Sequence, residues 1–184
     1  MAKFSISLLA TVIFLLVVLS APAVARNVGP YFNFSVGNSE YDTDITNFDD
    51  SNTSVSLGVG FSLNRNLAIE TNFINFGDSD DDIFPVWTIS TVALEVCAVG
   101  KVPFSPIFSG YAKAGFFSWD SEVSEQGFGV FVTDEGTDIT YGLGAMLNMS
   151  ENVAAYFEYQ NYDFDLEGVD ISLDNYSIGF QLSF

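Results

Sequence analysis

The chain has no histidine, one cysteine and only five Lys or Arg residues in its 184 positions. A single cysteine, Cys97, excludes an internal disulfide framework and any zinc site built from several thiolates. Without histidine, the chain lacks the most common general base and metal ligand of proteins. The few cations stand against 24 Asp or Glu, so the net charge is −19. A chain this acidic cannot neutralise phosphates, and we exclude a nucleic-acid partner.

Long apolar runs are confined to the beginning of the chain. Lys3 is followed by the apolar stretch Leu8–Leu19 and then by Ala23-Val24-Ala25, which fits the cleavage pattern of a secretory signal peptide. Twelve apolar residues are too few for a helix across a bilayer core of roughly 30 Å. We therefore predict a signal peptide over 1–25, with an uncleaved membrane anchor as the alternative, and one exported domain over 26–184.

The rest of the chain alternates between apolar and polar residues, although 48% of the whole sequence is hydrophobic and 16% aromatic. The end of the chain shows this most clearly, because every second residue from Tyr176 to Phe184 is large and apolar. Such a period of two is typical of strands with two different faces. The pattern predicts eight strands, at about 30–38, 54–63, 66–76, 86–101, 107–119, 138–148, 152–162 and 173–184.

The two faces differ in a way that favours a barrel in lipid over a soluble, lipid-carrying barrel. One face consists largely of Gly, Ser, Asn and Thr, which fit a narrow lumen, and the other carries Phe, Leu, Val and Ile, which suit lipid. A few charged residues interrupt the polar face, and we expect them to pair in the lumen: Glu70, Glu95, Lys101, Lys113 and Glu158.

The connections alternate in length and in charge. Short turns are predicted at 63–66, 103–106 and 148–152, and long connections at 38–53, 77–85, 120–138 and 163–174. The long connections hold 20 of the 24 acidic residues. This asymmetry is typical of outer-membrane barrels. We predict an all-β fold, an eight-stranded antiparallel up-and-down transmembrane β-barrel, with short turns in the periplasm and four acidic loops outside.

At this point the chain resembles the OmpA-type family of eight-stranded outer-membrane barrel domains. The resemblance covers 26–184 and rests on the terminal alternating run and on the stretches Ala68-Ile69-Glu70, Ala98–Pro103 and Tyr111–Gly115. It implies that the terminal run is an insertion signal read by the outer-membrane assembly machinery, made of Tyr176, Ile178, Phe180, Leu182 and Phe184. It also implies acid–base pairs across the lumen, which either gate solutes or simply fill and stabilise the barrel.

These features lead us to expect a monomer in the outer membrane of a Gram-negative bacterium, in contact with its lipids and lipopolysaccharide. The leading function is a structural or surface-interaction role, in adhesion or membrane integrity, with an unidentified extracellular partner. The alternative is a narrow, cation-preferring, porin-like channel. An outer-membrane lipid-modifying enzyme is a third hypothesis, which the missing histidine argues against.

No catalytic residue, cofactor or dedicated metal site is predicted. Cys97 falls beside Glu95 on the inward face, where we interpret it as a small structural residue. The acidic run 78–82 has calcium-like spacing but lacks the glycine and glutamate of an EF-hand loop. The apolar stretch 127–132 lies within the third long connection; it either extends a hairpin, which we favour, or contacts a partner.

Overall fold

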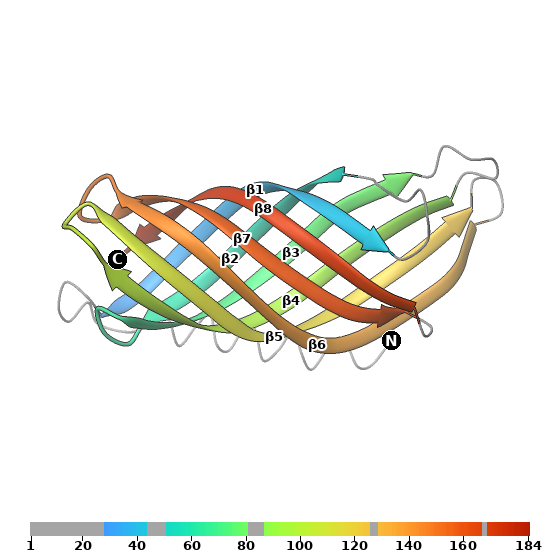
Figure 1. Ribbon diagram of the computed structural model, residues 1–184, viewed down its shortest axis with the longest axis horizontal. Helices are drawn as coiled ribbons and strands as arrows, with labels where there is room; N and C mark the ends of the chain where they lie inside the picture. Colours follow the sequence, from blue (N-terminus) through green and yellow to red (C-terminus); the bar gives the residue numbers. More distant parts are fainter. Residues whose placement is uncertain (1–27, 44–50, 81–86, 126–128, 167–168) are drawn as a thin grey trace.

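The computed structural model describes residues 28–43, 51–80, 87–125, 129–166 and 169–184. Each strand pairs antiparallel with the next in the chain, and β1 pairs with β8, which closes the barrel (Figure 1). This confirms the predicted fold class. The predicted signal peptide, residues 1–25, lies outside the described residues. The described strands are β1 (Gly29–Thr43), β2 (Ser51–Ser62), β3 (Leu67–Asp80), β4 (Trp87–Pro103), β5 (Phe108–Glu125), β6 (Gly129–Asn148), β7 (Val153–Leu166) and β8 (Val169–Ser183).

Among the described residues, no helix is both long enough and apolar enough to cross a membrane.

Three tight turns gather at one end of the barrel, which we call the turn end; the opposite end is the open end. In each turn a short polar side chain accepts hydrogen bonds from two backbone N–H groups that follow it. Asn64, Ser105 and Ser150 play this part. Such side-chain turns compete well with regular pairing and reverse the chain within a few residues. The three short turns predicted from the sequence are confirmed.

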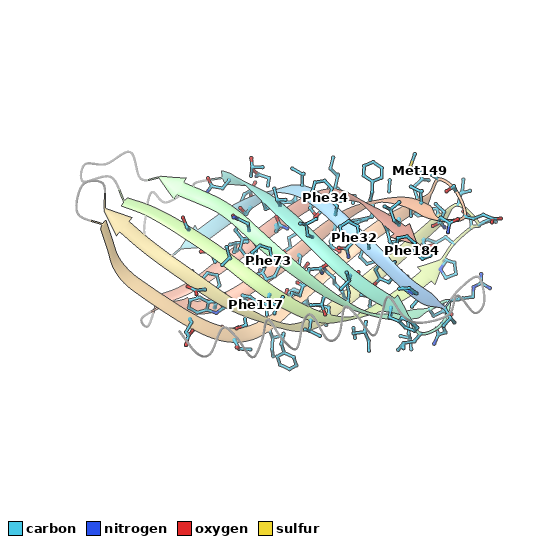
Figure 2. The ribbon with its side chains drawn as sticks, turned by 180° about the vertical axis from the view of Figure 1, so that it is seen from behind. Phe32, Phe34, Phe73, Phe117, Met149 and Phe184 are labelled. Carbon is cyan, nitrogen blue, oxygen red and sulfur yellow. The ribbon has the colours of Figure 1, made fainter. Side chains whose placement is uncertain are left out.

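The outward face of the barrel is an apolar band. Phe32, Phe34 and Phe73 are exposed on this face, and in Figure 2, where they are labelled, Met149 and Phe184 mark the turn end. Along β6 the outward residues Ile139, Tyr141, Leu143 and Leu147 are 49% to 63% exposed. In water such a surface would be unfavourable, whereas in lipid it has no cost. The face that the sequence assigned to lipid therefore forms the outer surface.

A belt of tyrosines ends this band toward the open end. Tyr159 and Tyr176 contact each other with ring centroids 5.1 Å apart, and the Tyr159 hydroxyl donates to Asp174 at 2.8 Å. On β6, the outward residue beyond Ile139 is Thr137. Tyrosine prefers the boundary between lipid and water because its ring is apolar and its hydroxyl is polar. The apolar band thus stops at this level.

Several strands continue past the belt, and some of the predicted strand ends at the open end are wrong. The fifth strand was expected to stop at 119 and the sixth to begin at 138, but β5 runs to Glu125 and β6 starts at Gly129. The long connections are correspondingly shorter than predicted. Apolar alternation ends where lipid ends, whereas backbone pairing continues in water with polar residues. For 129–132, the described part of the stretch 127–132, the favoured interpretation as part of an extended hairpin agrees with this pairing.

The continuation is uneven around the barrel. Pairing of β2 with β3 stops at Val55 and Asn75, and pairing of β6 with β7 stops at Thr140 and Tyr162. Between these two limits, β3 to β6 extend as a four-stranded sheet, and β5 and β6 reach farthest in Figure 1. We call residues 76–80, 87–91, 121–125 and 129–139 the projecting sheet.

A glycine marks the place where β3 separates from β2. Gly77 has a φ of +83°, a left-handed conformation that favours glycine, and its N–H donates to the side chain of Asn75. A Cβ at this position would lie 2.8 Å from the carbonyl oxygen of Thr53. The register of β3 against β4 shifts here, between Asn75 and Asp78, as in a β-bulge, which increases local twist.

We predict that Leu143→Arg destabilises the inserted barrel by about 2 to 4 kcal/mol, since Leu143 lies midway along the apolar band and a charge there must leave water. The matched control is Thr137→Arg, six residues along the same face and beyond the tyrosine belt, which should change the free energy of unfolding little. Urea unfolding in lipid vesicles measures both. Equal effects of the two substitutions would contradict the placement of the band.

Candidate functional site

The lumen is organised around one ammonium group and three carboxylates. Lys113 on β5 lies 2.8 Å from Glu158 on β7, 3.2 Å from Glu95 on β4 and 3.8 Å from Glu70 on β3, measured from Nζ to the closest carboxylate oxygen in each case. All four side chains are buried inside the barrel, and Glu95 is 0% exposed. An ion pair that is removed from water persists only when its remaining hydrogen bonds are satisfied.

Neutral side chains complete the hydrogen bonding of each carboxylate. Asn72 donates to Glu70 at 2.9 Å and to Glu95 at 2.7 Å, so that it bridges two acids. Glu95 also accepts from Gln160 and from the hydroxyl of Tyr162. These contacts join β3, β4, β5 and β7 across the lumen. The cluster is therefore one connected network that links strands across the lumen, and not a set of isolated ion pairs.

Lys101, the fifth charged residue predicted for the lumen, lies apart from this cluster. Its ammonium donates to Gln181 at 3.3 Å and lies 4.8 Å from the centre of the Tyr31 ring. Lys101 lies near the turn end of β4. At that level its ammonium contacts side chains of β8 and β1, and Lys113 lies farther toward the open end. The structure thus brings four of the five predicted residues together and leaves Lys101 nearby.

Two rows of residues have the same construction on opposite halves of the barrel. In the first row Tyr31 on β1 lies across Gly60 on β2 and donates to Glu70 on β3 at 2.8 Å. In the second row Tyr111 on β5 lies across Gly144 on β6 and donates to Glu158 on β7, also at 2.8 Å.

Only glycine permits this crossing, because a Cβ at Gly60 or Gly144 would come within 2.2 Å of the tyrosine ring. The sequence shows recurrent glycines on the polar face, but it gives no sign of which tyrosines cross them.

Apolar layers close the lumen above and below the charged cluster. Toward the open end, buried aromatic and aliphatic side chains pack together: Ile74, Phe76, Ala93, Phe117, Trp119, Tyr162, Phe164 and Leu173. Phe117 and Phe76 meet Tyr162 edge to face, with ring centroids 5.0 Å apart in both contacts. Toward the turn end, a second cluster contains Tyr31, Ala68, Val99, Tyr111, Met146 and Ala154, with Tyr156 against it.

Sequence reasoning missed the open-end layer because it treated the inward face as mainly small and polar. A usable signal was the strand phase. Starting from Lys113, every second residue leads to Phe117 and Trp119, and from Glu158 the same step leads to Tyr162 and Phe164.

The space left beside the charges is very small. Two cavities of about 10 Å³ each adjoin Glu70 and Glu158, and a volume of this size holds about one water molecule. Such spaces are far below the size of a solute path. Chemically, the described side chains of the lumen can hold a charge in place and fix neighbouring strands, and these two cavities are too small for an organic substrate.

The remaining candidates from the sequence show no site geometry among the described residues. Cys97 is 1% exposed and its sulfur lies against Gly115. Within the described part of the chain, no group of three or more Cys, Asp or Glu residues has the geometry of a metal site. The side chains of the acidic run 78–82, where no dedicated metal site is predicted, lie outside the described residues.

A closed antiparallel barrel with an apolar outer band, a tyrosine belt and a polar, packed interior is a transmembrane β-barrel. The model of the outer membrane protein β-barrel domain family matches residues 11–184. The chain belongs to this family, and its location is the outer membrane. No curated protein sequence matches the chain.

Solved structures share the fold at low sequence identity. Neisserial surface protein A (NspA) superposes with a TM-score of 0.73 at 12% identity, covering 84% of this chain and 97% of that one. Ail of Yersinia pestis, in complex with the heparin analogue sucrose octasulfate, gives 0.57 at 17% identity, with 83% and 99% covered. OprG of Pseudomonas aeruginosa gives 0.57 at 13% identity, with 86% and 97% covered.

We predict that Lys113→Met destabilises the barrel by about 3 to 5 kcal/mol, because it leaves buried carboxylates without their shared cation. Lys101→Met is the matched control: it also deletes one lumen ammonium, but one whose described contacts are Gln181 and the Tyr31 ring rather than a shared set of carboxylates, so its effect should be clearly smaller. Urea unfolding in vesicles provides the comparison. The proposed central position of Lys113 is wrong if both variants lose the same free energy.

Proposed function

We propose that this protein is a non-conducting outer-membrane barrel that presents the projecting sheet to an extracellular protein partner. The observation that carries the proposal is the contrast between the two ends of the structure. The lumen is filled by a charged cluster and two apolar layers, whereas β3 to β6 continue beyond the barrel with backbone groups available for pairing.

The edge of β6 supports a binding role. Over the described residues, the backbone of Gly129–Ile139 pairs with β5 on one side and with no strand on the other. Such a strand edge offers N–H and C=O groups to an added strand, a common mode of peptide recognition. Soluble proteins usually protect such an edge, so an unprotected one that faces away from the membrane suits a partner.

The charge of this region defines the partner further. No Lys or Arg follows Lys113 in the sequence, whereas the long connections are rich in Asp and Glu. An acidic edge attracts cationic segments and repels anionic ones. We therefore expect an extended, basic protein segment. The polyanionic heparin analogue bound by Ail is the opposite kind of ligand, and we do not expect this chain to bind it.

Export and insertion fit the same proposal. We infer that residues 1–25 are a cleaved signal peptide, that the short turns face the periplasm and that the barrel is a monomer. The alternating residues Tyr176 to Phe184 line the outward face of β8, where we propose that the assembly machinery reads them. The lumen charges Glu70, Glu95, Lys113 and Glu158 act in stability, and we assign no catalytic role to any residue.

The cation-preferring channel is less well supported. A conducting lumen requires a continuous polar path, and here Phe117, Trp119 and Leu173, each at most 3% exposed, lie across the way to the open end. No described feature of the lumen favours conduction over filling.

We predict that the barrel in lipid nanodiscs binds an extended peptide of alternating Lys and Val, and binds the Glu and Val analogue much more weakly. Removing residues 122–133 and joining Ser121 to Asp134 through an Asn-Gly turn should abolish binding, because β6 loses half of its open edge. Fluorescence anisotropy of labelled peptide measures the affinity.

The matched control shortens the β7–β8 hairpin, which lies outside the projecting sheet, by replacing 165–170 with Asn-Gly between Phe164 and Ile171, which face each other in the β7–β8 ladder. This control removes three acidic residues, whereas the first deletion removes two. If the control loses binding as fully as the first variant, attraction to diffuse negative charge explains the result and edge pairing does not.

A further inference from the structure

Two buried amide oxygens converge on one point inside the lumen without a hydrogen-bond donor. Asn33 and Asn72 are 4% and 3% exposed, and the Oδ1 atom of each has no partner among the described residues. The two residues flank Gly58 in one row of the sheet. Both oxygens lie within 2.2 Å of the point that a Cβ on Gly58 would occupy. Buried acceptors without a donor are costly, so this arrangement requires an explanation.

The direction of the Asn72 oxygen follows from its neighbours. Its amide nitrogen donates to both Glu70 and Glu95. Turning the amide over would aim its oxygen at two carboxylates, which repel it. The Asn72 oxygen must therefore face Gly58, and the point between it and Asn33 has a negative electrostatic environment, with Glu70 only two residues away on β3.

The internal repeat of the barrel shows what the matching point on the other half contains. The row Asn33, Gly58 and Asn72 on β1, β2 and β3 corresponds to the row Lys113, Gly142 and Gln160 on β5, β6 and β7. Each row lies two residues along the strands from a Tyr–Gly–Glu row, on the same inward face. In the second half, the ammonium of Lys113 pairs with Glu158 at 2.8 Å. In the first half, Asn33 has no positive charge to offer Glu70.

The charge balance of the lumen agrees with this comparison. Three carboxylates, of Glu70, Glu95 and Glu158, face two ammonium groups, of Lys101 and Lys113, among the described lumen residues. One negative charge is left over in a space closed by apolar layers. A buried charge of this kind is paired or it is neutralised.

We propose that the lumen binds one monovalent metal cation, Na⁺ or K⁺, between Asn33 Oδ1 and Asn72 Oδ1 and beside Glu70. The cation supplies to Glu70 the positive charge that the Lys113 ammonium supplies to Glu158 in the other half. Amide and carboxylate oxygens are hard ligands of the kind that such ions prefer. Gly58 is required because a side chain there would fill the site. Since the lumen is closed at both ends, the cation enters as the barrel folds.

The test is refolding in defined salts. We expect the protein refolded in NaCl or KCl, with a chelator of divalent ions, to resist heat better than protein refolded in N-methyl-D-glucamine chloride of equal ionic strength. The temperature at which the folded gel band disappears should rise with the logarithm of the small-cation concentration, as binding to the folded state requires. A wild-type protein indifferent to the cation would overturn the proposal, and a water molecule or a turned Asn33 amide donating to Asn72 would then explain the two oxygens.

Asn33→Lys makes the test specific, because it supplies the missing ammonium in the position that corresponds to Lys113. This variant should fold and keep the higher midpoint in every salt. The matched control Ser177→Ala changes a buried polar residue next to Glu158 in the other half and should keep the cation dependence. If Asn33→Lys remains dependent on small cations, the ions act elsewhere, as on the acidic loops, and the proposal is wrong.

A direct measurement covers the case in which Asn33→Lys fails to fold. Crystals of the wild-type protein refolded in RbCl should show an anomalous diffraction peak between the two Oδ1 atoms above Gly58. Absence of a peak at that point would refute the site.

Discussion

The contact of Lys113 with three buried carboxylates is the interaction on which the rest of the barrel depends. It links β5 to β3, β4 and β7 through the lumen, so that strands distant in the sheet hold one another at fixed positions. Buried charges of this kind are costly unless every lone pair has a partner. The tyrosine and amide side chains that surround the cluster supply those partners, and apolar layers lie above and below it. The interior of the barrel is therefore packed like the core of a globular protein.

The two halves of this core repeat one arrangement of residues. Tyr31, Gly60 and Glu70 repeat as Tyr111, Gly144 and Glu158, and each glycine leaves room for a tyrosine to cross to its glutamate. The halves differ mainly where Lys113 on one side corresponds to Asn33 on the other. That difference gives the lumen its asymmetry, because the shared ammonium lies 2.8 Å from Glu158 but 3.8 Å from Glu70. The two halves share one arrangement and differ in one charge. This difference explains the close contact of Lys113 with Glu158 and the amide oxygens of Asn33 and Asn72 that lack a donor.

The sequence alone predicted much of this fold, for identifiable reasons. Alternation separated the two faces of each strand, and the small polar residues of one face indicated that Leu143 and Ile178, on the other face, contact lipid. The same alternation put Glu70, Glu95, Lys113 and Glu158 on the inward face. It could not show that Lys101 stays apart from them, because that depends on barrel shear and strand register. It also could not show the projecting sheet, where pairing continues through polar residues after the lipid signal has ended. The inward positions of Phe117 and Tyr162 were accessible in principle, by carrying the phase of the charged residues forward.

The central claim is that packed side chains close the lumen, and single-channel recording tests it most directly. Purified protein, shown to be inserted by the heat-dependent shift of its gel band, would be added to a planar lipid bilayer in concentrated KCl. We expect no conductance steps above those of the bare membrane, because the charged cluster and the aromatic layer fill the described lumen and the two cavities beside Glu70 and Glu158 each hold about one water molecule. Regular steps of constant amplitude that increase with protein concentration would contradict it and would establish a continuous path through the barrel.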